Sequence, residues 1–155
     1  MEGGECFRAE VPMAENDALV RNLFQAWNDR DYDAIAGVVA PDCTLVDKGS
    51  GRKLEGREGF TWLARALFDA MPDATFTLDR LTSQGDTVVV EYTGSGTQTG
   101  DLVLHAGTVP ATGRHVTLHA CDIYELKDGK IQEGRAYLDT GAIMNQLGLT
   151  EQLRA

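Results

Sequence analysis

Apolar residues recur at helical spacing along the first half of the chain, which predicts several helices there. The first stripe predicts a helix that begins near Ala18, with Asn16 or Asp17 as its cap. Its apolar side is formed by Leu19, Val20, Leu23, Phe24 and Trp27. A shorter helix follows, and a third is predicted from about Arg57 to Ala70, before the helix-breaking Pro72.

The second half changes to an alternating pattern, which is typical of β-strands. The predicted strands cover residues 43–47, 74–83, 87–97, 114–126 and 131–138. Asp128-Gly129 favours a tight hairpin, and residues 102–104 could add a short strand. A last short helix, capped by Asp139 or Thr140, should end at Gly148. Helices followed by a run of antiparallel strands predict an α+β fold, with a curved antiparallel sheet packed on three N-terminal helices.

The strand RHVTLHACDIYEL, residues 114–126, carries one acid on an otherwise apolar face. Its even-numbered positions are Val116, Leu118, Ala120, Asp122, Tyr124 and Leu126. An isolated ionised carboxylate is costly on such a face, so Asp122 should be protonated, paired or directed into a cavity. One interpretation is an inert structural aspartate with satisfied hydrogen bonds. The other is an acid tuned for chemistry in a pocket.

Length and composition narrow the class of protein. The 155 residues suggest a single domain at 14–150, with a disordered tail at 1–13 and a short tail at 151–155. No apolar run is long enough to span a bilayer, and the net charge of -10 argues against nucleic acid or an anionic membrane as partner. The three cysteines lack metal-type spacing, and reduced thiols in a cytoplasmic protein are the simplest interpretation.

Several segments carry a family resemblance. FQAWNDRDYDAIAGVVAPDCTLVD resembles the first helices and strand of the nuclear-transport-factor-2-like fold. GTQTGDL, followed by PATGRHVTLHACDIYELKDGKIQEGRAYLDTGAIMNQLG, resembles the SnoaL-like polyketide cyclases within that superfamily. The resemblance implies a cone-shaped α+β barrel with a small-molecule pocket. It also implies a hydrophobic substrate of polyketide type, as in antibiotic biosynthesis, and a homodimer. We expect no cofactor, and we expect no metal, because no helical or turn spacing brings together three ligands from Asp122, His119, His105 and Glu133.

The resemblance also assigns roles to individual positions. APDCTLVD is similar to the ketosteroid isomerase segment that ends in the catalytic base, which places a base at Asp47. The protonated, oxyanion-stabilising aspartate of those isomerases matches Asp122. The acid/base aspartate of SnoaL-like cyclases falls at Ala136, and their active-site histidine falls at Asp122, so that catalytic pair is not kept.

Two carboxyl groups are therefore the candidate catalytic residues. Asp122, deep on an apolar face, would stay protonated and hold an enolate oxygen, whereas Asp47, near the mouth, would be ionised and remove a proton. The alternative for Asp47 is a loop-edge aspartate that caps the turn at Lys48-Gly49. Candidate substrate-binding residues are Tyr92, Tyr124, Trp27, Phe24, Trp62, Leu118, Ala136 and His105. His119 should lie outside the cavity, and His105 is a possible lid residue.

These observations favour a cofactor-independent cyclase or isomerase acting on a hydrophobic, carbonyl-rich small molecule. A second hypothesis is an epoxide-opening or other hydrolase of the same fold, with a water held between Asp122 and another polar group. A third is a non-catalytic small-molecule-binding protein. The fold alone does not decide among them, because it hosts many functions.

Overall fold

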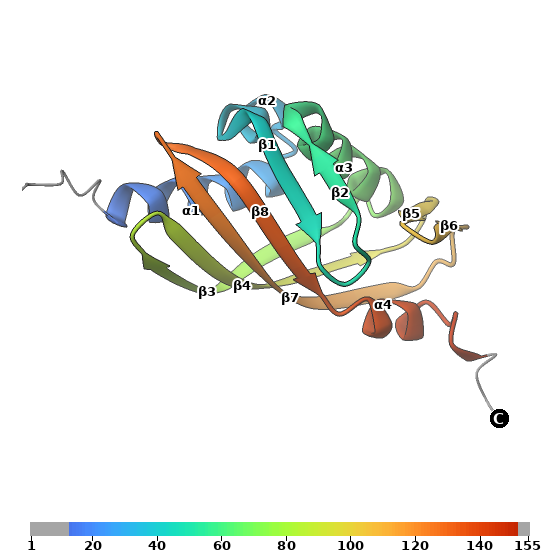
Figure 1. Cartoon of the computed structure of the whole chain (residues 1–155). Coiled ribbons are helices and arrows are strands. Elements are labelled where there is room, and N and C mark those ends of the chain that lie inside the picture. Colours follow the sequence, from blue (N-terminus) through green and yellow to red (C-terminus); the bar gives the residue numbers. More distant parts are fainter. Residues whose placement is uncertain (1–12, 152–155) are drawn as a thin grey trace, which may run out of the picture.

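The fold is a curved sheet with helices packed against one face (Figure 1). The computed structural model describes residues 13–151. Its helices are α1 (Met13–Asn28), α2 (Tyr32–Gly37), α3 (Gly56–Ala70) and α4 (Thr140–Gln146). Its strands are β1 (Val39–Asp47), β2 (Lys53–Glu55), β3 (Thr75–Gln84), β4 (Thr87–Thr97), β5 (Leu102–Leu104), β6 (Gly107–Val109), β7 (His115–Lys127) and β8 (Lys130–Leu138). The α+β class predicted from the sequence is confirmed.

The main sheet differs in two respects from the predicted antiparallel barrel. Its strand order is β2-β1-β8-β7-β4-β3, so β2 and β3 are free edges and the sheet does not close into a barrel. β1 pairs with β8 in parallel, so the sheet is mixed. Short hairpin turns are the sequence signals that predict strand pairing. They connect strands that follow each other in the chain, so they do not predict the pairing of β1 with β8. β5 and β6 form a separate two-stranded hairpin.

The hairpin between β7 and β8 forms where Asp128-Gly129 predicted it. Lys127 pairs with Lys130, and Asp128 and Gly129 adopt φ values of 52° and 70°. Positive φ at both central residues is the twist that matches a tight antiparallel hairpin. The pairing that starts at this turn shifts its register once, between Glu125 and Leu126. The even-numbered face of β7 is turned toward the interior as predicted.

The first helix begins earlier than the sequence pattern indicated. α1 starts at Met13, so Asn16 and Asp17 lie within the helix and the predicted cap is wrong. Asn16 is buried and its side-chain amide donates to the carbonyl oxygen of Gly85 at 3.5 Å, a tertiary contact that replaces the capping role. At the other end of the chain, Asp139 caps α4 by accepting a hydrogen bond from the Ala142 amide at 2.9 Å. The tails predicted at 1–13 and 151–155 lie outside the described residues, apart from Met13 and Glu151.

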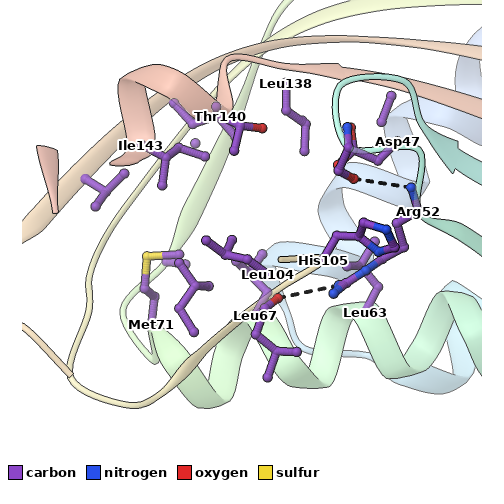
Figure 2. A pocket seen from close by; sticks show the side chains of 18 of the residues that line it. Asp47, Arg52, Leu63, Leu67, Met71, Leu104, His105, Leu138, Thr140 and Ile143 are labelled. Atoms are coloured by element: carbon purple, nitrogen blue, oxygen red, sulfur yellow. Dashed lines mark hydrogen bonds between the residues drawn. The ribbon is translucent and has the colours of Figure 1, made fainter. Parts of the chain in front are cut away.

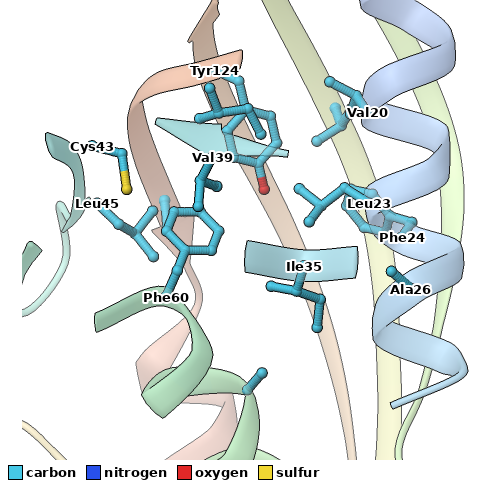
Figure 3. Packing of buried hydrophobic residues seen from close by; sticks show 14 of the residues in the cluster. Val20, Leu23, Phe24, Ala26, Ile35, Val39, Cys43, Leu45, Phe60 and Tyr124 are labelled. Atoms are coloured by element: carbon cyan, nitrogen blue, oxygen red, sulfur yellow. The ribbon is translucent and has the colours of Figure 1, made fainter. Parts of the chain in front are cut away.

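The main core lies between the concave side of the sheet and helices α1 to α3. Figure 3 shows Tyr124 of β7 among Leu23 of α1, Val39 of β1 and Phe60 of α3. The side chain of Asn28 ties the end of α1 to β3, because it donates to the Phe76 carbonyl and accepts from the Phe76 amide, each at 2.8 Å. These two hydrogen bonds fix Phe76, which lines both cavities described below.

A smaller apolar cluster lies at the opposite end, beneath β5, β6 and α4. Its buried residues are Ala70, Leu102, Val109, Val116 and Leu147. The fully buried side chain of Gln98 fixes the segment after β6: its amide nitrogen donates to the Val109 carbonyl at 3.0 Å, and its oxygen accepts from the Thr112 hydroxyl at 2.6 Å. The space between the two clusters is where the cavities open. Among residues 13–151, no helix combines the length and apolar character needed to cross a membrane.

Candidate active site

Asp122 is a buried acid on the inner face of the sheet. Only 7% of its surface is exposed. Tyr124, two residues along β7, donates its hydroxyl to Oδ2 at 2.8 Å, and Tyr92 of β4 donates to Oδ1 at 3.4 Å. Tyr92 pairs with Ala120 and Val90 pairs with Asp122, so the Tyr92 side chain reaches Asp122 diagonally across the ladder.

The surroundings of Asp122 change its ionisation. Burial raises the pKa of its carboxyl to about 7, the hydrogen bonds from Tyr124 and Tyr92 act in the opposite direction, and the charge of Asp47 adds to the rise. Burial also raises the pKa of Tyr92 and Tyr124 well above their usual range, with the neighbouring Asp122 charge as a second cause. Both phenols therefore remain hydrogen-bond donors while Asp122 can change between its neutral and ionised forms near pH 7.

A small inner cavity of about 90 Å³ adjoins Asp122. It is lined by Leu23, Phe24, Trp27, Leu45, Phe60, Leu63, Phe76, Tyr92, Asp122, Tyr124, Ala136 and Leu138. Apart from Asp122 and the two phenol groups, this lining is apolar and aromatic. The carboxyl of Asp122 is thus a polar group beside an apolar space, which is the arrangement predicted for a tuned acid.

The inner cavity adjoins a larger outer cavity of about 300 Å³. The two share lining residues Trp27, Leu45, Leu63, Phe76, Tyr92, Ala136 and Leu138. The exposed residues of the outer wall come from the β5–β6 hairpin (Val103, His105 and Ala106) and from Met144 of α4. The mouth therefore lies between these two elements, which occupy the same end of the molecule in Figure 1.

Asp47 belongs to the outer cavity. It ends β1 and turns toward the space that Figure 2 shows between Leu138 and His105. Its Oδ1 accepts from the amides of Gly49 at 2.9 Å and Ser50 at 3.3 Å, and its Oδ2 accepts from the Ser50 hydroxyl at 2.5 Å. The turn-capping interpretation thus describes its contacts, and the same carboxylate also forms part of the cavity wall. A carboxylate has about four acceptor sites, so these contacts leave it room for one more proton donor.

Asp47 and Asp122 are placed in one row of the sheet by strand register. Asp47 pairs with Ala136 across β1 and β8, and Ala136 pairs with Asp122 across β8 and β7. Residues in one row point to the same face, so the two carboxyl groups flank the methyl group of Ala136. Strands lie about 4.8 Å apart, which puts the two Cα atoms about 10 Å from each other. A small ligand carbonyl and its neighbouring carbon can occupy the space that the short Ala136 side chain leaves.

Most of the predicted substrate-binding residues lie around these cavities. Tyr92, Trp27 and Ala136 line both, Phe24 and Tyr124 line the inner cavity, and Leu118 and His105 line the outer one. Trp62 is the exception: it is 42% exposed on α3 and lines neither cavity. It flanks the inward-facing Leu63 as the helical spacing indicated, and its ring lies under the Arg52 guanidinium at 5.5 Å.

The histidines lie at the periphery of this site. His119 is exposed on the outer face of β7, where its Nδ1 lies 3.1 Å from the Thr93 hydroxyl, as its odd-numbered position predicted. His105 lies at the tip of the β5–β6 hairpin and forms part of the mouth. Within residues 13–151, no cluster of three or more His, Cys, Asp or Glu side chains is arranged to hold a metal ion.

Some cavity residues were not anticipated from the sequence. Arg52, Ser50 and Thr140 contribute polar groups to the outer wall, and they come from loops and element ends whose positions depend on the whole fold. Gly94 and Gly96 line it from β4, and a Cβ atom at Gly94 would lie 2.9 Å from the Phe76 ring. Their signal was present, because glycines within a strand mark places where another group approaches closely.

Comparisons with known proteins agree with this architecture. A family model described as the SnoaL-like domain matches residues 20–134. A proposed SnoaL-like polyketide cyclase from Jannaschia sp. CCS1 is 25% identical, with a TM-score of 0.78 over 94% of this chain and 97% of that one. TsrD from Streptomyces laurentii is 27% identical, with a TM-score of 0.78 over 90% of this chain and 98% of that one.

A more distant neighbour has a different named activity. A LEH-like epoxide hydrolase from M. tuberculosis is 19% identical, with a TM-score of 0.65 over 90% of this chain and 96% of that one, and this likeness concerns the fold alone. The search of curated proteins returned no match. The family model covers most of the folded region, from α1 into β8, and the cavity-lining residues from Ala136 onward lie beyond its matched range. The chain belongs to the SnoaL-like domain family, with the nuclear-transport-factor-2-like fold.

Proposed function

We propose that this protein is a cofactor-independent cyclase or isomerase that moves a proton next to a carbonyl group of a hydrophobic small molecule. The observation that carries the proposal is the Asp122 carboxyl, buried beside an apolar cavity with its pKa raised to about 7. A neutral carboxyl in such a place can donate a hydrogen bond to an oxygen that gains negative charge. The named activities of the SnoaL-like relatives support a substrate of polyketide type.

The two aspartates have separate roles in this reaction. The Asp47 carboxylate removes a proton from the carbon beside the carbonyl, and the electron pair of that C–H bond passes to the carbonyl oxygen. Asp122 donates to that oxygen as its charge develops, and Tyr124 and Tyr92 hold the acid in place. Return of the proton at another carbon completes an isomerisation. Alternatively, the enolate carbon attacks a second carbonyl to form a new C–C bond, and the proton taken by Asp47 passes to the resulting alkoxide, which completes a ring closure.

The first step can be tested without knowing the natural substrate. Ketones with acidic protons beside the carbonyl, such as β-tetralone, are incubated with the protein in deuterium oxide, and loss of the proton signal is followed by NMR. We expect exchange well above the buffer rate for apolar bicyclic ketones. Leu67→Trp, which fills the outer cavity, is the matched control and should abolish the acceleration. Exchange at the buffer rate for a whole panel of such ketones would contradict the proposal.

A hydrolase of the same fold is the second candidate, and one contact favours it. Tyr92 lines both cavities and its hydroxyl lies 3.4 Å from Asp122, so the two groups can hold a water molecule between them and a ligand. Turnover of an aromatic epoxide in isotopically labelled water separates the two candidates. Solvent oxygen in the product supports hydrolysis, whereas an unchanged epoxide together with catalysed ketone exchange supports the cyclase or isomerase. Tight binding with neither reaction supports a non-catalytic binding protein.

A further inference from the structure

Arg52 places a positive charge in the wall of an otherwise largely apolar outer cavity. It follows the turn that Asp47 caps, and its Nη1 donates to the Val103 carbonyl of β5 at 3.5 Å (Figure 2). Val103 and its neighbour His105 belong to the exposed rim, so the guanidinium lies at the mouth rather than at the depth of the cavity. Asp122, in contrast, lines only the inner cavity.

The Arg52 guanidinium has much of its donor capacity available. The ion pairs of the described part of the chain join Lys53 with Glu55, Arg114 with Glu151, and Arg135 with Glu125 and Glu133. Arg52 takes part in none of these pairs. A guanidinium has five N–H donors, and the long contact to Val103 uses one of them.

The carboxylate that shares this cavity wall does not neutralise Arg52. Asp47 accepts from Gly49 and from the amide and hydroxyl of Ser50, and among the described residues it forms no ion pair with Arg52. Figure 2 also places the His105 ring beside Arg52, whereas Leu63, Leu67 and Leu104, which line the same cavity, are apolar. A planar cation next to apolar walls is suited to an anionic oxygen group on an apolar body.

We propose that Arg52 is a specificity-determining residue that binds an anionic group, of carboxylate type, at one end of the substrate. The inference rests on the proposed function only in taking the connected cavities as the substrate site. The substrate is then an amphiphile: its carbonyl end enters the inner cavity beside Asp122, its apolar body fills the outer cavity, and its anionic end faces Arg52 at the mouth. Because the protein as a whole carries a net charge of -10, Arg52 provides local attraction for a ligand that the global field repels.

A pair of fluorescent probes tests this directly. Anilinonaphthalene sulfonate and phenylnaphthylamine share one aromatic body, and only the first carries a negative charge. Both are titrated into wild type, Arg52→Met and Arg52→Lys. Arg52→Met loses a charge-assisted hydrogen bond, so its affinity for the sulfonate should fall by about tenfold. Its affinity for the neutral probe should stay within about twofold of the wild-type value. Arg52→Lys keeps the charge and should retain most of the sulfonate affinity.

Two controls locate the effect. Arg80→Met removes an exposed cation on β3, away from the cavity lining, and should not change the affinity for either probe. Leu67→Trp should lower the affinity for both probes, because the larger side chain takes up space in the cavity that holds their shared aromatic body. Circular dichroism and thermal melting establish that each variant is folded. If Arg52→Met does not fold, the comparison of wild type with Arg52→Lys still tests the role of the guanidinium.

The possible outcomes separate this inference from the proposed function. Equal changes for the charged and neutral probes in Arg52→Met, or no change in either, would overturn the role of Arg52. Failure of the wild type to bind the sulfonate would overturn it too. Selective weakening of the sulfonate supports the role of Arg52 even if ketone exchange is absent, in which case only the proposed reaction fails.

Discussion

Asp47 of β1 and Asp122 of β7 lie in one row across the sheet, with Ala136 of β8 between them. The parallel pairing of β1 with β8 creates this row. Asp47 faces the outer cavity and Asp122 the inner one, and Ala136 lines both. A base and an acid on either side of a small residue can act on one ligand, the base at the carbon beside a carbonyl and the acid at the carbonyl oxygen.

The size of residue 136 should control access to this row. Ala136→Val adds two methyl groups between the carboxyls in a residue type that strands tolerate, and we expect ketone exchange to fall by about tenfold or more. Ala111→Val, at an exposed position that lines neither cavity, is the matched control and should leave exchange nearly unchanged. Full activity in Ala136→Val would mean that the ligand does not occupy the space between the aspartates.

Protein stability should depend on the ionisation of Asp122. The pKa of its carboxyl is about 7 in the folded protein, against an ordinary value of 3.8. At a pH between these two pKa values, Asp122 keeps its proton in the folded chain and releases it in the unfolded chain. The free energy of unfolding should therefore decrease as the pH rises from about 4 to about 7 and level off above that, by an amount on the order of 4 kcal/mol.

Comparison of wild type with Asp122→Asn isolates this contribution, because the variant lacks the titrating group. Urea unfolding of both proteins across the pH range gives the difference in free energy of unfolding. A difference that stays constant from pH 4 to pH 8 would show that Asp122 titrates as an ordinary exposed carboxyl.

Tyr124 should tune the acid without taking part in proton removal. Its hydrogen bond at 2.8 Å lowers the pKa of Asp122, so Tyr124→Phe should move that pKa upward. Carboxyl carbon chemical shifts measured by NMR during a pH titration report the change. Tyr137→Phe, whose ring is 45% exposed on β8, should leave the titration where it is in the wild type. A downward movement in Tyr124→Phe would contradict the assigned hydrogen bond.

Asp47 should show separable structural and chemical roles. Asp47→Asn retains an oxygen that can accept from Gly49 and Ser50, so the fold should survive while ketone exchange falls by about 10²-fold or more. Asp47→Ala removes the turn contacts as well and should lower the free energy of unfolding by about 1 kcal/mol. Wild-type exchange rates in a folded Asp47→Asn protein would remove Asp47 from the reaction and leave it only the turn.

The sequence allowed prediction of those features that depend on neighbouring residues. β4 runs from Thr87 to Thr97 as its β-branched pattern indicated, and the alternation in β7 correctly placed Asp122 inside and His119 outside. The Asp128-Gly129 turn carries its own conformational preference, so it was predictable as well.

Features that depend on distant contacts were missed. β2 is only three residues long and exists because it pairs with β1, and the parallel β1–β8 pairing depends on a crossover of most of the domain. For the same reason Arg52, which reaches the cavity through the β1–β2 turn, has no local sequence signal. Trp62 flanks the buried stripe of α3, and helical spacing alone does not show whether such a flanking residue reaches the cavity.

The most direct test of the central claim is the rate of ketone proton exchange in Asp122→Asn. The substitution keeps the size of the side chain and removes the acidic proton that Asp122 is proposed to donate. Loss of that donor should reduce catalysed exchange by about 10²-fold or more, with circular dichroism and sulfonate binding unchanged. Exchange at the wild-type rate in a folded Asp122→Asn protein would contradict the account.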